Sequence, residues 1–297
     1  MTVRAREVGG DRSHMVVRAA REQPFPAAVA AQRWGRSQTA PALLAPRSSG
    51  IVHRIVSMSI VPAAIAEDLA PTGTLRAAIN LGNPVLVQGT PTAPTGVTVD
   101  ITRELGSRLG LPVELVCFDA ARKSFEAMAA GRADICFLAI EPVRAAEVAF
   151  TAPYVVIEGV FVVPRDSVIS TRADVDRDGV RIGVNEGSAY DLFLSRTLQH
   201  ARTVPVDDGV DVFRDLGLEV AAGIKQPMIE YVSSHPEFRL IEGRFMEIRQ
   251  ALGTTRTRGP ETVQFLRAFI EDLKASGFIA DALRRANQPD ATVAPPG

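Results

Sequence analysis

The chain lacks the features that mark several large classes of protein. It has only two cysteines, Cys117 and Cys136, in 297 residues, which excludes a disulfide scaffold and leaves one bridge at most. Its 33 basic and 34 acidic residues nearly cancel, so no strong field attracts nucleic acid or an anionic membrane. The most apolar stretch, Tyr154 to Val163, is too short to cross a bilayer and contains Glu158. We therefore expect no nucleic-acid partner and no transmembrane helix.

The first 57 residues differ in composition from the rest. They hold nine Arg and three acidic residues, and scattered prolines interrupt every apolar period, so we predict that residues 1–57 form a disordered tail. A secretory signal needs a basic start followed at once by an apolar core, and the nearest candidate, Ile51 to Ala66, lies far from the start. Our hypothesis is that Met58 is the true initiator and that the Arg-rich segment before it is not translated.

From Gly73 onward the chain has ample apolar content, and it alternates between short β-rich runs and helical patterns, which is typical of an α/β fold with parallel strands. The first series contains strands over Leu75 to Ile79, Val113 to Phe118 and Ala133 to Leu138, separated by helices at 98–109 and 124–130. Such sheets commonly place the first strand between the other two. Cys117 and Cys136 then lie on separated strands, and we expect two buried free thiols.

A second series follows Pro153. We predict paired strands over 154–157 and 160–163, further strands at 181–184, 219–222 and 239–241, and helices after Gly187, at 210–216 and at 228–232. Two terminal helices, 261–276 and 278–286, have apolar faces that need a partner, and we expect them to pack on the first series. Residues 288–297 are predicted to be frayed.

The order of several short motifs resembles the family 3 solute-binding proteins, the amino-acid receptors of ABC importers. The resemblance runs from about residue 70 to about 287, and its motifs are 73–79 (GTLRAAI), 96–101 (GVTVDI), 109–114 (LGLPVE), 130–135 (AGRADI), Arg144 with 149–154 (AFTAPY), and 181–187 (RIGVNEG). Each motif alone is weak, but their order is specific.

The resemblance implies a type II periplasmic-binding-protein-like fold with two α/β lobes and a double-strand hinge. Lobe 1 would comprise residues 70–158 and 244–287, and lobe 2 residues 159–243. A small amino acid or carboxylic acid would be held between them, without a cofactor, by a monomer whose partner is an ABC permease. The location implied is periplasmic. A cytoplasmic location is the alternative, because no convincing secretory signal is present.

Arg144 lies where the family places the arginine that grips the ligand carboxylate. A planar guanidinium suits a carboxylate bidentately. The alternative is a surface residue that pairs with Glu141 or Glu147.

From the other lobe, the backbone amides of Gly187, Ser188 and Ala189 precede a helix and are predicted to bind the same carboxylate. The Ser188 side chain has a second reading as the helix cap.

Asn80 follows the first strand, where family members often present a polar group to the ligand, and the loop that begins at Asn83 usually lines the pocket. Ordinary turn chemistry is the alternative for both.

Amino-acid receptors usually carry an Asp in lobe 2 for the ligand ammonium, whereas this chain has Lys225 near that place. Either Glu141 holds an ammonium, or the ligand has none and Lys225 helps to bind a mono- or dicarboxylate. Lys225 could also be a surface residue without a ligand contact.

Metal and enzyme motifs are weak or missing. The run that begins at Asp174 imitates a calcium loop but has Asn185 at position twelve, and no two histidines have metal spacing, so we expect no metal site. No nucleophile elbow or Walker loop occurs. One enzymatic alternative remains because cyclohexadienyl dehydratases share this fold, with Glu141 or Glu186 as the general acid. A cytosolic ligand sensor is the other alternative to a transport receptor.

Overall fold

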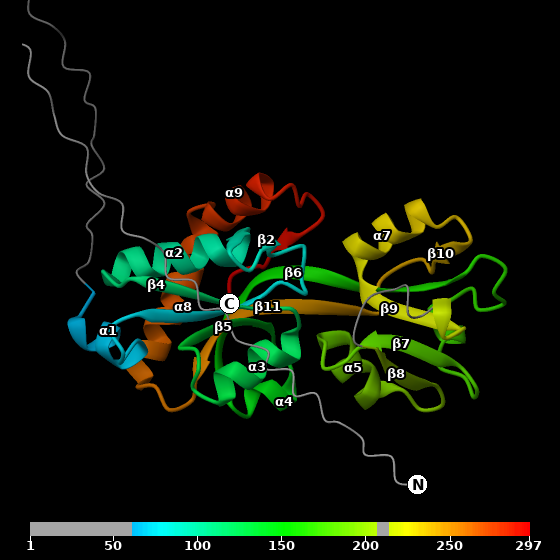
Figure 1. Ribbon diagram of the computed structural model, residues 1–297, viewed down its shortest axis with the longest axis horizontal. Helices are drawn as coiled ribbons and strands as arrows, with labels where there is room; N and C mark the ends of the chain where they lie inside the picture. Colours follow the sequence, from blue (N-terminus) through cyan, green and yellow to red (C-terminus); the bar gives the residue numbers. More distant parts are fainter. Residues whose placement is uncertain (1–60, 207–213) are drawn as a thin grey trace, which may run out of the picture. The chain divides into compact units, whose positions relative to one another are not determined.

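The computed structural model describes residues 61–206 and 214–297, which belong to one compact unit (Figure 1). The predicted disordered tail, the Met58 hypothesis and most of the helix predicted over 210–216 lie outside these residues. Within the described ranges, every helix is too short or too polar to span a membrane.

Lobe 1 contains the three parallel strands predicted from the first series. β1 (Leu75–Asn80) pairs with β4 (Val113–Phe118) on one side and with β5 (Ile135–Ala139) on the other. This arrangement confirms the predicted strand order. Ala78 is opposite Cys136 and Ile79 is opposite Cys117, and both cysteines are free. Cys136 is buried, which raises the pKa of its thiol to about 12, whereas Cys117 is only half-buried.

Of the two helices predicted in lobe 1, the one expected over 98–109 begins and ends close to its predicted bounds, whereas the one expected over 124–130 begins three residues earlier. In α2 (Val97–Leu109), apolar residues four apart form one buried face, and Gly110 ends the helix with a left-handed φ of 67°. The remaining helices of this lobe are α1 (Ala63–Leu69), α3 (Ala121–Ala129) and α4 (Pro142–Ala145). A short hairpin, β2 (Gln88–Thr90) with β3 (Ala93–Thr95), precedes α2.

Lobe 2 has its own parallel strands. β7 (Arg181–Asn185) pairs with β8 (Arg202–Val206) and with β9 (Val220–Ile224). Its other elements are the 3₁₀ turn η1 (Arg172–Asp174), α5 (Ala189–Thr197), α7 (Lys225–Ser234) and β10 (Phe238–Leu240). Both lobes therefore have a mixed α/β fold.

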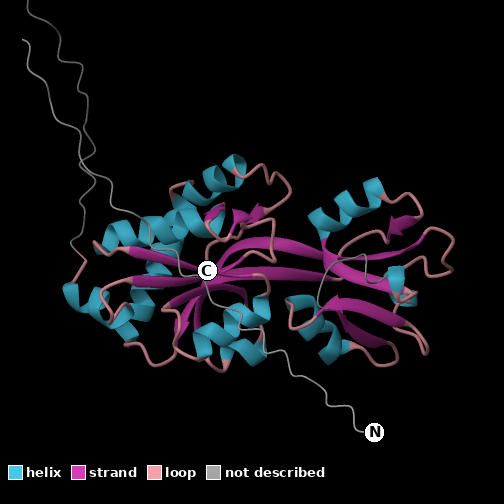
Figure 2. Ribbon diagram, in the orientation of Figure 1, coloured by secondary structure: helices cyan, strands magenta, loops and turns pink. Residues whose placement is uncertain are grey.

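Two long strands run through both lobes (Figures 1 and 2). β6 (Val148–Pro164) and β11 (Met246–Thr255) pair antiparallel along their shared length. The prediction of two strands separated at Glu158 and Gly159 is wrong, because β6 is one continuous strand of 17 residues. Its first part pairs with β11 and its later part with β9 and β10, so the chain passes from one lobe to the other without a turn.

The terminal helices pack on lobe 1, as predicted. α8 (Pro260–Ala275) and α9 (Phe278–Arg285) are tied to α2 by two ion pairs, Arg108–Asp272 at 2.6 Å and Arg285–Asp100 at 2.7 Å. The prediction that residues 288–297 are frayed is wrong. β12 (Thr292–Val293) pairs with β6, and Lys274 donates to the Pro295 carbonyl at 2.8 Å.

A buried carboxylate joins three separate segments of lobe 1. Asp134 has no exposed side-chain surface and accepts hydrogen bonds from the Arg76 amide at 2.9 Å and from the Arg76 guanidinium at 2.7 and 3.0 Å. Arg258, which lies just before α8, also donates to it at 3.2 Å. Because Asp134 is the acidic partner of both guanidinium groups, its loss leaves two partly buried cations uncompensated.

We predict that Asp134→Ala lowers the free energy of unfolding by about 3–5 kcal/mol, as expected when one partner of a buried ion pair is removed. Urea denaturation followed by circular dichroism measures this change. Asp178→Ala is the matched control, because the Asp178 side chain is 94% exposed, and it should shift stability by no more than about 0.5 kcal/mol. Equal effects of the two substitutions would contradict the role of Asp134.

A second ion cluster joins β6, the first residue of α7 and the loop before β11, where the two long strands pass between the lobes. Glu158 of β6 accepts from Lys225 Nζ at 2.6 Å and from Arg244 Nη1 at 3.0 Å. These two hydrogen bonds, the one from Lys225 first, hold the pKa of Glu158 below its ordinary value of 4.5. The cluster therefore stabilises the fold above this pH, and its contribution is lost as the pH falls and Glu158 is protonated.

The expected consequence is a pH-dependent effect of Glu158→Gln. At pH 7 the substitution should lower the free energy of unfolding by at most about 1 kcal/mol, because the pair is partly exposed. The difference from the unsubstituted protein should shrink below about pH 4.5, because the unfolded chain then takes up a proton at this carboxyl before the folded protein does. Thermal unfolding between pH 3 and pH 8 measures it, and a difference that is constant with pH would contradict the assignment.

Candidate functional site

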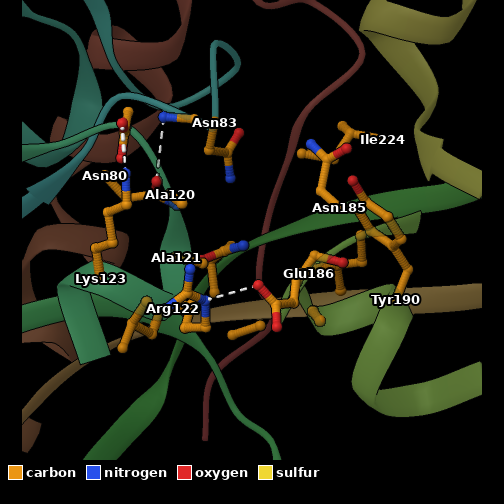
Figure 3. A pocket seen from close by; sticks show the side chains of 18 of the residues that line it. Asn80, Asn83, Ala120, Ala121, Arg122, Lys123, Asn185, Glu186, Tyr190 and Ile224 are labelled. Carbon is orange, nitrogen blue, oxygen red and sulfur yellow. Dashed lines mark hydrogen bonds and ion pairs between the residues drawn. The ribbon is translucent and has the colours of Figure 1, made fainter. Parts of the chain in front are cut away.

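A cavity of about 550 Å³ lies between the two lobes, where several parallel strands end (Figure 3). This is the edge at which open α/β sheets commonly bind ligands. The residues that line the cavity from lobe 1 are Asn80, Gly82, Asn83, Asp119, Ala120, Ala121, Arg122, Lys123, Leu138, Ala139 and Arg144. Those from lobe 2 are Asn185, Glu186, Ser188, Ala189, Tyr190, Val206 and Ile224, and Ile248 and Gln250 contribute from β11.

Arg144 is the most buried charged side chain of this lining. It is on α4, directly after β5, and only 2% of its surface is exposed. Its Nη1 donates to the Ala139 carbonyl at 3.2 Å, and its Nη2 donates to the Gly187 carbonyl of lobe 2 at 2.8 Å. Since a guanidinium carries five N–H groups, these two bonds leave donors for a ligand.

The charge of Arg144 is poorly compensated within the protein. Burial lowers the pKa of Arg144 to about 10, although nearby Glu141 and Cys136 act in the opposite direction. The side chain is therefore still a cation at neutral pH. In the described part of the chain no carboxylate forms an ion pair with it, so the proposed pairing with Glu141 or Glu147 is not observed. A buried cation without a carboxylate partner favours an anionic ligand.

Glu141 does not line the cavity. It is 4% exposed, and its carboxylate accepts from Arg196 Nη1 of α5 at 2.9 Å. The structure thus places Glu141 in an ion pair between the lobes, away from the position at which it was expected to hold a ligand ammonium. The sequence could not show this pairing, because Arg196 lies 55 residues further along the chain.

The loop before α5 lies at the cavity in a different way from that predicted. The Gly187 amide donates to the Asp191 carboxylate at 2.8 Å, and the Ser188 amide donates to the Asn185 carbonyl at 3.0 Å. These two amides are therefore occupied within the loop. Ala189, the first residue of α5, lines the cavity, and the role predicted for its amide stays a prediction. The Ser188 side chain caps the helix by accepting from the Asp191 amide at 3.1 Å, as its second reading proposed.

Gly187 is required by both the backbone and its neighbour. Its φ of 65° lies in the left-handed region, and a Cβ at this position would come within 2.9 Å of Arg122 Cβ. The absence of a side chain allows lobe 2 to approach α3 closely. The Gly187 carbonyl, rather than its amide, then contacts Arg144.

Asn80, the last residue of β1, and Asn83, in the loop that follows, both line the cavity. Asn80 accepts from the Gly82 amide at 3.1 Å, so it forms the predicted turn and also lines the cavity. Asn83 is 5% exposed, and its Oδ1 has no hydrogen-bond partner in the described structure. Figure 3 shows both residues opposite Asn185 and Tyr190 of lobe 2.

Lys225 is not among the residues that line the cavity. It belongs to the Glu158 cluster, beside a second hollow that Arg172 and Glu242 also line. The structure therefore does not bring Lys225 and Arg144 to one site. The expectation of a dicarboxylate ligand therefore loses Lys225 as its second cation.

Sequence reasoning missed Arg122 and Gln250. Arg122 lies directly after the loop that follows β4, and it forms an ion pair with Glu186 of lobe 2 at 3.3 Å (Figure 3). The rule that polar residues follow the ends of parallel strands could have found Arg122. Gln250 is buried on β11, and no sequence signal marks it, because the side that this strand turns to the cavity depends on its register with β6.

The model of bacterial extracellular solute-binding proteins, family 3, matches residues 75–286. No curated protein sequence matches the chain at a significant level. Among solved structures, the cysteine-binding protein from Campylobacter jejuni is similar with a TM-score of 0.64 and 18% identity, over 77% of this chain and 99% of that chain.

Two further structures share the fold. An amino acid ABC transporter substrate-binding protein of Streptococcus pneumoniae, bound to L-arginine, has a TM-score of 0.62 and 16% identity over 74% of this chain and 97% of that chain. An ancestral amino-acid-binding protein, a precursor of cyclohexadienyl dehydratase, has a TM-score of 0.61 and 17% identity over 74% and 97%. Because the family model matches well over half of the sequence, this chain belongs to the family 3 bacterial extracellular solute-binding proteins.

Proposed function

We propose that this protein captures a small carboxylate-bearing molecule, an amino acid or an organic acid, between its two lobes for delivery to an ABC importer. The observation that carries the proposal is the burial of Arg144 in the cavity without a carboxylate partner in the described structure. A ligand carboxylate would compensate this charge and accept the remaining N–H groups of the guanidinium.

Binding couples to closure of the lobes because the contacts come from both sides. Arg144, Asn80 and Asn83 belong to lobe 1. Asn185 and Ala189 belong to lobe 2. A ligand that contacts both sets favours the state in which the lobes are close. β6 and β11 join the lobes, so bending of these two strands would allow the motion.

The expected partner is an ABC permease that recognises the closed state, and the expected location is extracytoplasmic, as in the family. A pocket shared by two lobes suits this role because the permease can distinguish loaded from empty protein by the positions of the lobes. Cell fractionation with an antibody against the chain tests the location, and recovery in the cytoplasmic fraction would favour the sensor alternative.

The enzymatic alternative keeps only one of its two candidate acids. A dehydratase needs a carboxylic acid that can reach the ligand. Glu141 is bonded to Arg196 and does not line the cavity, whereas Glu186 does line it and is half exposed. Because Glu186 is also paired with Arg122, we assign it to the contact between the lobes, and we expect no turnover of prephenate or arogenate by the purified protein.

Arg144→Ala should abolish or strongly weaken ligand binding while the protein remains folded. A thermal-shift screen of amino acids and organic acids first identifies a compound that raises the melting temperature of the unsubstituted protein. Calorimetry with that compound should then show binding to Arg144→Ala weakened by about 2–5 kcal/mol, which is at least about 30-fold. Arg144→Lys should restore little, since an ammonium lacks the bidentate fork.

Lys225→Ala is the matched control for this test. The substitution removes a cation that lies outside the cavity, beside the second hollow. The affinity for the same compound should therefore change by less than about threefold. Unchanged affinity of Arg144→Ala, or an equal loss in both variants, would refute the proposed role of Arg144.

A further inference from the structure

We propose that the ligand of this cavity is a carboxylate that offers an uncharged hydrogen-bond donor, a hydroxyl or an amide N–H, to Asn83, and that it carries no ammonium group. The inference rests on the proposed function and names the chemical class of the ligand. Asn83 would then be the residue that distinguishes a ligand with an uncharged hydrogen-bond donor from a ligand with an ammonium group.

Asn83 is held in place and its acceptor is unused. Its amide donates to the Asn80 carbonyl at 3.3 Å, and its own carbonyl accepts from Leu86 and Val87 at 3.1 and 3.0 Å, so the backbone around it is fixed. The side chain is 95% buried, lines the cavity and leaves Oδ1 without a partner. An unsatisfied buried acceptor costs about 1–3 kcal/mol, and a ligand donor would recover this cost.

Several uncharged polar groups line the cavity beside Asn83. Asn80, Asn185 and Gln250 each present a carboxamide, and Tyr190 presents a buried phenol. Carboxamides and phenols both donate and accept hydrogen bonds without a charge. This set suits hydroxyl and amide groups of a ligand, whose desolvation costs far less than that of an ion.

The described carboxylates that line the cavity are poorly placed for an ammonium group. The side chain of Asp119 is 74% exposed and is bonded to Lys123 at 2.7 Å. The side chain of Glu186 is 50% exposed and is paired with Arg122 at 3.3 Å. An ammonium beside Asn83 would therefore lose its water without gaining a buried counter-charge from the described lining, while Arg144 already supplies one buried positive charge.

Matched pairs of compounds test this inference. Each pair has the same carbon skeleton and the same configuration and differs only in hydroxyl against ammonium: lactate and alanine, malate and aspartate, 2-hydroxyglutarate and glutamate, and 2-hydroxyisocaproate and leucine. N-acetylated forms of the same four amino acids supply an amide N–H. We expect the pair that binds to show at least tenfold tighter binding of the hydroxy or N-acetyl acid by calorimetry.

The outcomes separate the two proposals. Tighter binding of the amino acid in every pair that binds, with loss of binding in Arg144→Ala, would overturn the inference and leave the proposed function intact. Binding by none of these compounds would count against the proposed function itself, which expects a small carboxylate, and the inference would fall with it.

Substitution of Asn83 supplies an independent readout. Asn83→Asp keeps the shape of the side chain but replaces the neutral acceptor with a carboxylate. It should shift the preference between the two members of the binding pair by at least tenfold toward the amino acid, because an ammonium then gains a counter-charge. Asn83→Leu is the matched control, since it removes the acceptor without supplying a counter-charge. It should weaken binding of the hydroxy or N-acetyl acid and should not strengthen binding of the amino acid.

Circular dichroism and urea denaturation show whether each Asn83 variant remains folded. If Asn83→Asp proves unstable, Gln250→Glu introduces a carboxylate from β11 and is expected to shift the preference in the same direction. Folded carboxylate variants with an unchanged preference would overturn the role of Asn83.

Discussion

The buried charge of Arg144 is the constraint on which the arrangement of the site depends. A guanidinium that is 2% exposed requires polar partners, and the protein supplies two backbone carbonyls, one from each lobe. These carbonyls satisfy part of its hydrogen-bonding capacity but do not neutralise its charge. The proposed ligand carboxylate would meet the remaining requirement, so the same residue that joins the lobes would also bind the ligand.

Two ion pairs also join the lobes. Arg122 pairs with Glu186, and Arg196 pairs with Glu141, so each lobe contributes one cation and one carboxylate to the other. Both pairs include a side chain that is at least a third exposed, and such pairs are weak individually. They orient the lobes at little energetic cost to opening, which suits the proposed closure on a ligand and its release.

Local patterns predicted most of the elements because each depends on residues close in sequence. The helix at 97–109 with its closing Gly110, the three strands of lobe 1 and the two terminal helices all follow from apolar spacing and end signals. The pattern was wrong at Glu158 and Gly159, where a turn was expected. Glu158 is instead satisfied by Lys225 and Arg244, from segments 67 and 86 residues away, so β6 continues.

The sequence by itself determined the α/β class, the family and the position of Arg144 after β5, because motif order and strand ends are written along the chain. Only the tertiary structure decided which groups face the cavity. Glu141 and Lys225 have the chemistry of ligand-binding residues, but each has a distant ion-pair partner that draws it elsewhere. Asn83 was expected near the pocket from the resemblance, but only the structure shows that its Oδ1 has no partner in the described part of the chain. Gln250 reaches the cavity through strand register, which depends on pairing with a distant segment and not on local spacing.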